Sequence, residues 1–159
     1  MVPAAGEANQ YRAVAAGCGC LGDARVVTIT VPGEIEFRGP VLSAVASLCR
    51  IACPDQSVGS EFTNEVVSAV GEGFNNAVIH AYKQMRGTVC LSVSFDSRQF
   101  VVELVENGRT FDPDAVPTFA DDELRESGFG LFIIRSFADE VSYTAGPPNR
   151  LRMAKCLPR

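Results

Sequence analysis

The stretch EFTNEVVSAVGEGFNNAVIHAYK occupies residues 61–83 and organises the rest of the chain. At about 3.6 residues per turn it predicts an amphipathic helix, whose apolar side can pack against a sheet. That apolar side comprises Val66, Val67, Val70, Phe74, Ala77, Val78 and Ala81. The opposite, polar side comprises Glu65, Glu72, Asn76, His80 and Lys83.

Glu72 and Asn76 on the polar side lie one helical turn apart, so their side chains point the same way. A carboxylate and a carboxamide aligned in this manner can hold a hydrated hard cation such as Mg²⁺. An isolated pair of this kind is more often an ordinary solvated face. The pair therefore indicates a cation site only in combination with the motifs that follow it.

The composition bounds the class of protein. The chain has 159 residues, of which 47% are apolar and 21% are charged, and its net charge is −5. These values predict one soluble domain that is large enough to bury a hydrophobic core. The acidic balance argues against a general nucleic-acid binder or a polybasic membrane anchor. No apolar run approaches the roughly 20 residues that span a bilayer.

The N-terminal residues lack the pattern of a signal peptide, so we expect a cytoplasmic protein with reduced thiols. Cys18 and Cys20 form a CxC in a small-residue stretch, which favours zinc only weakly because the chain has one histidine. The remaining cysteines are predicted to be small core residues: Cys49, Cys53, Cys90 and Cys156.

The pattern along the chain predicts both strands and helices. Ser60 is the predicted N-cap of the organising helix, which should run to about Met85 and close at Gly87. Ser127 is the predicted N-cap of the last helix. The other predicted elements are strands at 24–33 and 34–37, a helix at 41–53 with Pro40 in its first turn, a hairpin at 88–106 turning at 96–98, a loop or lid at 108–127, a helix at 128–140 and a hairpin around 146–149.

Two further motifs carry chemistry. Glu106-Asn107-Gly108 ends a predicted strand, where a carboxylate can accept a hydrogen bond and a glycine leaves room for a flat ring. Taken by itself, this motif is more often an ordinary strand-terminal turn. The segment 127–131, SGFGL, opens a helix, where glycines let backbone N–H groups approach an anion, although tight packing or a turn explains most such glycine pairs. The sequence contains neither a P-loop nor a Rossmann fingerprint.

In this order the motifs resemble those of the histidine-kinase-like (GHKL, Bergerat-fold) ATPase superfamily, and within it the anti-sigma-factor serine/threonine kinases. The segments that carry the resemblance are EVVSAVGEGFNNAVIHAY at 65–82, VELVENGRTFDP at 102–113 and ESGFGLFIIRSFADEVSY at 126–143. It implies an α+β two-layer sandwich over residues 24–159, in which a mostly antiparallel sheet is covered on one face by about three helices. Residues 1–23 are interpreted as a flexible extension.

The resemblance also implies a role for each matching residue. Glu72 would be the general base, Asn76 the Mg²⁺ ligand and Glu106 the reader of the adenine amine. Residues 109–127 would be the lid over ATP. The residues implied in nucleotide binding are Asn75, Asn76, His80, Glu106, Gly108, Phe111, Ser127, Gly128, Phe129, Gly130 and Leu131. For His80, a helix-surface histidine packed under the lid is an equally good interpretation.

One residue departs from the family pattern. The adenine-reading position is ordinarily Asp, and here it is Glu106. The additional methylene moves the carboxylate by about 1.5 Å, a distance that matters for a buried hydrogen bond. The departure predicts weaker ATP binding, or altered base preference, relative to a Glu106→Asp variant.

As a function, the resemblance implies a kinase that uses ATP and Mg²⁺ to phosphorylate a STAS-type anti-anti-sigma protein, and that otherwise sequesters a sigma factor. It also implies a homodimer, for which the exposed face of the first strand or of helix 41–53 could provide the contact. The acidic composition predicts no direct binding to nucleic acid or membrane. The alternative is a catalytically weak partner switch in which ATP only sets the conformation. A detached histidine-kinase ATP domain is a more distant possibility, because no phosphoacceptor segment is present.

Overall fold

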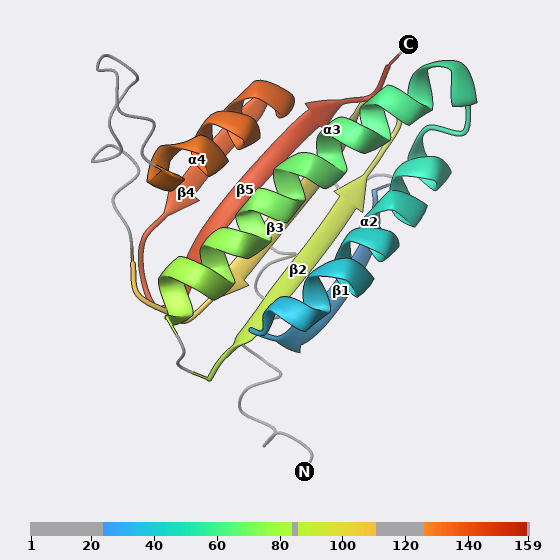
Figure 1. Cartoon of the computed structure of the whole chain (residues 1–159). Helices are drawn as coiled ribbons and strands as arrows, with labels where there is room; N and C mark the ends of the chain where they lie inside the picture. Colours follow the sequence, from blue (N-terminus) through green and yellow to red (C-terminus); the bar gives the residue numbers. More distant parts are fainter. Residues whose placement is uncertain (1–23, 84–85, 111–125, 159) are drawn as a thin grey trace, which may run out of the picture.

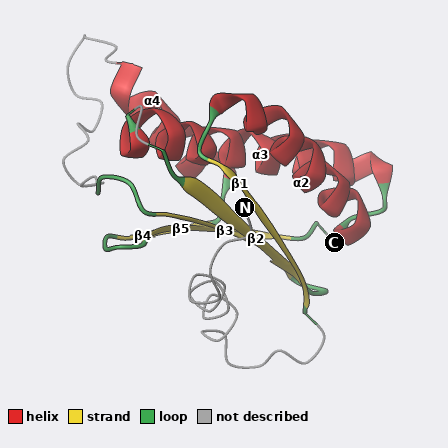
Figure 2. Ribbon diagram, turned by 90° about the horizontal axis from the view of Figure 1, so that it is seen from below, coloured by secondary structure: helices red, strands yellow, loops and turns green. Residues whose placement is uncertain are grey.

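A layer of helices covers one face of an antiparallel sheet (Figures 1 and 2). The computed structural model describes residues 24–83, 86–110 and 126–158. Within these residues one five-stranded sheet has the order β1-β2-β3-β5-β4, and every neighbouring pair is antiparallel. The α+β two-layer fold predicted from the sequence is therefore confirmed.

The sheet order places the last strand inside the sheet, between β3 and β4. Figure 1 shows α3 crossing the middle of the sheet, with α2 on the side of β1 and α4 on the side of β4. In chain order the elements are β1 (Arg25–Pro32), the 3-10 turn η2 (Ile35–Phe37), α2 (Arg38–Ala52), α3 (Gln56–Asn75), the π-helix η3 (Asn76–Tyr82), β2 (Thr88–Phe95), β3 (Gln99–Glu106), α4 (Glu126–Phe137), β4 (Glu140–Thr144) and β5 (Asn149–Cys156).

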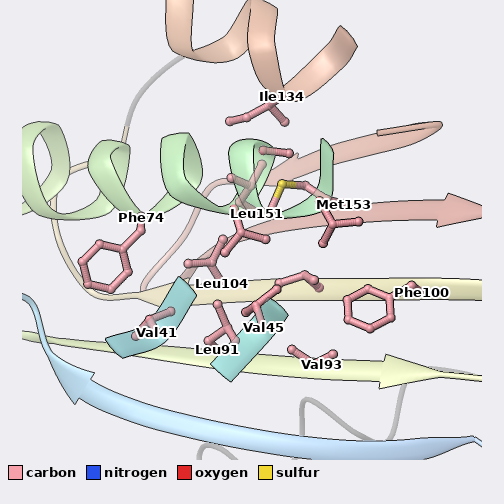
Figure 3. Close-up of a cluster of buried hydrophobic side chains, with 14 of the residues drawn as sticks. Val41, Val45, Phe74, Leu91, Val93, Phe100, Leu104, Ile134, Leu151 and Met153 are labelled. Carbon is pink, nitrogen blue, oxygen red and sulfur yellow. The ribbon is translucent and has the colours of Figure 1, made fainter. Parts of the chain in front are cut away.

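The core lies between the helices and the sheet. Figure 3 shows side chains from all three helices meeting the alternate residues of β2, β3 and β5 that face them: Val41, Val45, Phe74, Leu91, Val93, Phe100, Leu104, Ile134, Leu151 and Met153. The predicted apolar side of the organising helix is largely confirmed, since Val66, Val70, Phe74, Ala77 and Ala81 are buried. Burial of this face accounts for the position of α3 over the centre of the sheet.

The start of α3 differs from the prediction. Ser60 lies inside the helix, and the N-cap is Asp55, whose carboxylate accepts a hydrogen bond of 2.9 Å from Ser57 N. An aspartate at an extended backbone position satisfies one of the free N–H groups of the first turn. The helix therefore begins one turn earlier than its apolar periodicity indicated.

The end of the helical segment also differs. It closes at Lys83, which adopts the left-handed conformation with φ of 42°, and Gly87 does not close it. Gly87 has a different function, because a Cβ there would lie 2.1 Å from Cε1 of the Tyr82 ring. The glycine thus lets the chain pass under a buried aromatic ring.

Residues 34–37 were predicted as a short strand, which is wrong. They form the turn η2, in which Phe37 N donates to Glu34 O at 3.1 Å, and α2 follows directly. The chain leaves β1 at Pro32, where Glu34 N donates to Pro32 O at 2.8 Å and Gly33 N donates to Gly87 O at 2.8 Å. α2 begins at Arg38, so Pro40 lies in its first turn as predicted.

The C-terminal half largely follows the prediction. Both hairpins form, and the predicted apolar face of α4 packs on the core through Leu131 and Ile134. Ser127 lies within α4 and is not its N-cap, because the helix begins at Glu126. Among the predicted core cysteines, Cys156 is exposed at the end of β5, whereas the other three are buried. In the described part of the chain, no helix is long and apolar enough to cross a bilayer.

Candidate functional site

The sequence motifs converge where the end of α3 meets the first turns of α4. A Cβ built on Gly130 would lie 3.0 Å from Oε2 of Glu72 and 3.5 Å from Oδ1 of Asn76. Two side-chain oxygens from one helix therefore approach the backbone of another, and only glycine leaves the space between them open. Fifty-odd residues of sequence separate these groups, and the contact between α3 and α4 brings them together.

Glu72 and Asn76 stand at the junction of α3 and the π-helix η3. The backbone N–H of Asn76 is shared between the carbonyls of Glu72 and Gly73, which marks the change in helical winding. Both side chains are half-buried, and Asn75 Nδ2 makes a long contact of 3.4 Å with Glu72 Oε1. A π-segment inside a helix is frequent at functional sites, because it changes the direction of the side chains that follow.

A polar network surrounds the end of β3. Glu106 is only 7% exposed, and its Oε1 accepts a 2.7 Å hydrogen bond from Nδ2 of Asn149, which opens β5. Its Oε2 accepts a short hydrogen bond from the N–H of Gly108. The buried carboxylate therefore has a partner on each oxygen, as burial of a charged group requires.

Gly108 is held against the end of the π-helix. A Cβ at this position would lie 2.6 Å from the carbonyl carbon of Ala81 and 2.7 Å from its oxygen. That same oxygen accepts a 2.9 Å hydrogen bond from the N–H of Arg109. The glycine is thus required by close packing of two backbones, a reason that the sequence motif does not reveal.

A small cavity of about 20 Å³ joins the two groups of polar residues. Its walls bring Asn76 from the helix together with Glu106 and Asn149 from the strand ends. The volume suits about one water molecule. The other lining residues are Gly73, Ala77, Ala81, Leu104, Tyr143 and Leu151.

The remaining predicted site residues lie in different surroundings. His80 is exposed and does not line this cavity, and Phe129 is 52% exposed and stacks on Phe132 at 6.3 Å between ring centroids. Leu131 is buried in the core. Ser127 and Gly128 lie in the first turn of α4. Residues 111–125, which include Phe111 and most of the predicted lid, are outside the described residues, as are Cys18 and Cys20.

Sequence reasoning missed Asn149 and Tyr143 as members of this site. Asn149 follows Gly146-Pro147-Pro148, so it was interpreted as a turn residue. Its role depends on the register of β5 against β3, which sets Asn149 opposite Glu106. The one local signal was a polar residue at the first position of a strand whose alternate residues are apolar.

The donor set fits a hydrated Mg²⁺ with a phosphate ligand. Within residues 24–83, 86–110 and 126–158, no three His, Cys, Asp or Glu side chains gather into a metal site. Mg²⁺ does not need such a cluster, since it keeps several waters and usually takes one or two protein oxygens together with substrate phosphates. The oxygens of Asn76 and Glu72 beside the open backbone of Gly130 match that requirement.

The family model of the histidine kinase-like ATPase domain matches residues 39–155. Since this match spans most of the chain, the protein belongs to the histidine kinase-like ATPase family. The resemblance found in the sequence is therefore confirmed at this level.

Individual relatives are serine-protein kinases. The chain is 30% identical over 135 residues to the serine-protein kinase RsbW of Staphylococcus aureus, covering 76% of this chain and 85% of that protein. For RsbW of Staphylococcus aureus strain bovine RF122 / ET3-1, the identity is 30% over 122 residues, covering 68% and 77%. Among solved structures, the histidine kinase domain from the Erythrobacter litoralis EL346 blue-light activated histidine kinase aligns with a TM-score of 0.48 and 20% identity, covering 74% of this chain and 60% of that chain.

Proposed function

We propose that this protein is an ATP-dependent protein-serine kinase and anti-sigma factor. It would phosphorylate a serine of a STAS-type anti-anti-sigma protein, and it would sequester a sigma factor when that antagonist is not available. The observation that carries the proposal is the position of Gly130 beside Glu72 and Asn76. The 30% identity to serine-protein kinases supports it.

Each residue of the site has a task in phosphoryl transfer. This reaction depends mainly on positioning and on neutralising charge at the phosphates. Asn76 would hold Mg²⁺, and the first turn of α4 would place backbone N–H groups at the phosphates. Glu72, with an oxygen facing Gly130, would take the proton of the attacking serine hydroxyl. Bound Mg-ATP supplies the phosphoryl group and the neutralising metal charge.

A nucleotide-binding switch with little phosphoryl transfer is a second candidate. One observation favours it: both oxygens of Glu106 already have partners inside the protein, and the adjoining cavity has only about 20 Å³. A transfer assay with labelled ATP and candidate antagonists separates the two functions. ATP binding without phosphoserine formation would support the switch and contradict the kinase.

Asn76→Ala is expected to weaken binding of Mg-ATP by about tenfold or more, because it removes the oxygen proposed to hold the metal. Calorimetric titration with ATP in the presence and absence of Mg²⁺ measures the effect. Asn64→Ala is the matched control, since Asn64 is exposed on the same helix. Equal Mg-dependent affinity of the natural protein and the Asn76→Ala variant would contradict the metal assignment.

The pH dependence of ATP binding should reflect the protonation of the Glu106 carboxylate. Burial raises the pKa of its carboxyl above the ordinary value near 4.5, although the hydrogen bonds from Gly108 and Asn149 act in the opposite direction. An acid with a raised pKa regains its proton earlier as the pH falls, and the neutral carboxyl accepts less well from an amine. ATP affinity should therefore decline on acidification before an ordinary glutamate would protonate.

Calorimetry between about pH 5 and pH 8 checks this expectation. The Glu106→Gln variant has no titrating group at this position, so its affinity should change less with pH. Protonation of the nucleotide phosphates is common to both proteins and cancels in the comparison. Identical pH profiles would show that Glu106 does not contact the base.

We further propose that the protein acts as a cytoplasmic homodimer without direct contact to nucleic acid or membrane. The edge strand β1 supports the dimer, because Val26 and Val27 are 43% and 37% exposed on it. An unpaired strand edge with apolar side chains readily pairs with another chain. Sedimentation should give the mass of two chains, and the mass of a single chain at micromolar concentration would contradict the dimer.

A further inference from the structure

We propose that residues 1–23 dock on the face of the sheet that points away from the helices and cover its centre. This face, here called the outer face, is a different surface from the candidate site. The inference therefore holds or fails independently of the proposed function. It gives a task to a segment whose sequence alone suggests a flexible extension.

The outer face is apolar in the middle of the sheet. Side chains alternate along a strand, so the residues between the core positions of β2, β3 and β5 belong to the outer face. Cys90 pairs directly with Val105, and Val101 pairs directly with Ala154, which gives two apolar rows across the central strands. The central members of the outer face are Cys90, Ser92, Val101, Glu103, Val105 and Ala154.

These central residues are buried, although the described helices all lie on the opposite face of the sheet (Figure 2). Cys90, Val105 and Ala154 are 1%, 3% and 4% exposed, and none of them belongs to the core cluster beneath the helices. At the rim formed by β1, Val26 is 43% exposed. An antiparallel sheet with one uncovered face is in contact with water there. The burial at the centre therefore requires a cover that the described residues do not supply.

A buried carboxylate lies between the two apolar rows. Glu103 pairs with Ser92 on one side and with Arg152 on the other. Its Oε2 is buried, lies 3.5 Å from Nη1 of Arg150 and accepts no hydrogen bond from the described residues. A buried carboxylate oxygen without a hydrogen bond is unfavourable. The cover should therefore bring hydrogen-bond donors as well as apolar side chains.

Residues 1–23 have the position and the length that such a cover needs. They lead into β1, which begins at Arg25. The register places Glu103 two strand spacings and three residue steps from Arg25, a distance of roughly 14 Å. A chain of this length can extend to about 75 Å. The segment can therefore reach every row of the outer face.

The composition of this segment matches the outer face. Its apolar side chains include Val14 and Leu21, which suit the two apolar rows. The run NQYR at 9–12 supplies four consecutive side chains with hydrogen-bond donors. Arg12 is the only cation in residues 1–23, and its charge complements the buried Glu103.

The other parts of the chain outside the described residues fit less well. Residues 84–85 and 159 are too short to cover three strands. Residues 111–125 join β3 to α4, and α4 packs on α3 over the opposite face of the sheet. The N-terminal segment is therefore the occupant to which we assign the outer face.

Timed alkylation of the full-length protein with iodoacetamide, followed by mass spectrometry of each cysteine peptide, tests the cover. In the natural protein, Cys90 should react at least about tenfold more slowly than the exposed Cys156. In a full-length variant with residues 2–22 replaced by a Gly-Ser sequence of equal length, the rate at Cys90 should rise about tenfold or more. Cys49, which is buried beneath the helices, is the internal control and should stay protected in both proteins.

A second measurement keeps the test decisive if the Gly-Ser variant loses protection at Cys49 and so fails to fold. A protease site inserted after Gly22 lets the folded full-length protein be cleaved, and gel filtration then removes the released segment. Cys90 should become reactive after this cleavage, whereas Cys49 should remain protected.

The outcomes distinguish the possible occupants. Protection of Cys90 that is independent of protein concentration, and that is lost when the natural residues 1–23 are replaced or removed, supports the inference. A Cys90 rate that rises on dilution of the natural protein would assign the cover to a second copy of the chain and overturn it. Equal Cys90 rates in the natural, Gly-Ser and cleaved proteins would overturn it as well, and residues 1–23 would then be a flexible extension.

Discussion

Glu72→Gln is expected to slow phosphoryl transfer to the antagonist serine by about 10²- to 10⁴-fold, the usual loss when a general base is removed. The affinity for Mg-ATP should stay within about threefold, because the substitution keeps the size of the side chain and removes only its ability to take a proton. The oxygen of Glu72 that faces Gly130 is the group whose loss is tested.

Single-turnover transfer of the γ-phosphoryl group from labelled ATP to the antagonist measures this effect. Glu61→Gln is the matched control, since Glu61 is exposed on the same helix, about three turns before Glu72. Undiminished transfer by Glu72→Gln would assign the proton to another acceptor. Loss of ATP binding together with transfer would indicate a structural role and contradict that of a base.

Gly108→Ala should lower the free energy of unfolding by about 3 kcal/mol, the upper part of the range for overpacking a close contact. The added methyl would meet two backbone atoms of Ala81 at 2.6 and 2.7 Å, and neither can move without shifting the end of the π-helix. The hydrogen bond from Arg109 N to Ala81 O would be strained in the same way. We also expect weaker ATP binding, because Gly108 N–H holds Glu106.

Urea denaturation with the natural protein as reference measures the stability. Gly39→Ala is the control, because a Cβ at Gly39 meets nothing within 4 Å. Since Gly39 lies in the first turn of α2, this substitution should be neutral or stabilise by up to about 1 kcal/mol. Similar stability of the two variants would mean that the strand end and the π-helix are free to separate.

Local sequence patterns predicted some residues of the candidate site and missed others. Glu72, Asn76 and Gly130 were predicted from spacing and from the family resemblance, and the structure brings them together. The sequence explained Gly108 only as leaving room for a flat ring. A glycine motif does not reveal that the backbone of Ala81 packs against this residue. Asn149 was missed for a similar reason: it lies 43 positions from Glu106 in the chain.

The errors in the fold have the same origin. The periodicity of 61–83 identified the buried face of α3, but the start of the helix depended on the capping carboxylate of Asp55. Residues 34–37 have strand-like composition, yet the hydrogen bond from Glu34 N to Pro32 O turns the chain out of the sheet, and η2 follows. Cys156 lies at the end of β5, where alternation no longer implies burial.

The sequence by itself therefore determined the order of the long helices and of the paired strands, most of the faces that they bury and the family to which the chain belongs, because burial periodicity and short motifs are local properties. The tertiary structure decided which polar groups meet. The placement of β5 between β3 and β4 sets Asn149 against Glu106, and the packing of α4 on α3 sets Gly130 against Glu72. Strand order and helix packing are settled by contacts between distant segments, and a local pattern does not encode them.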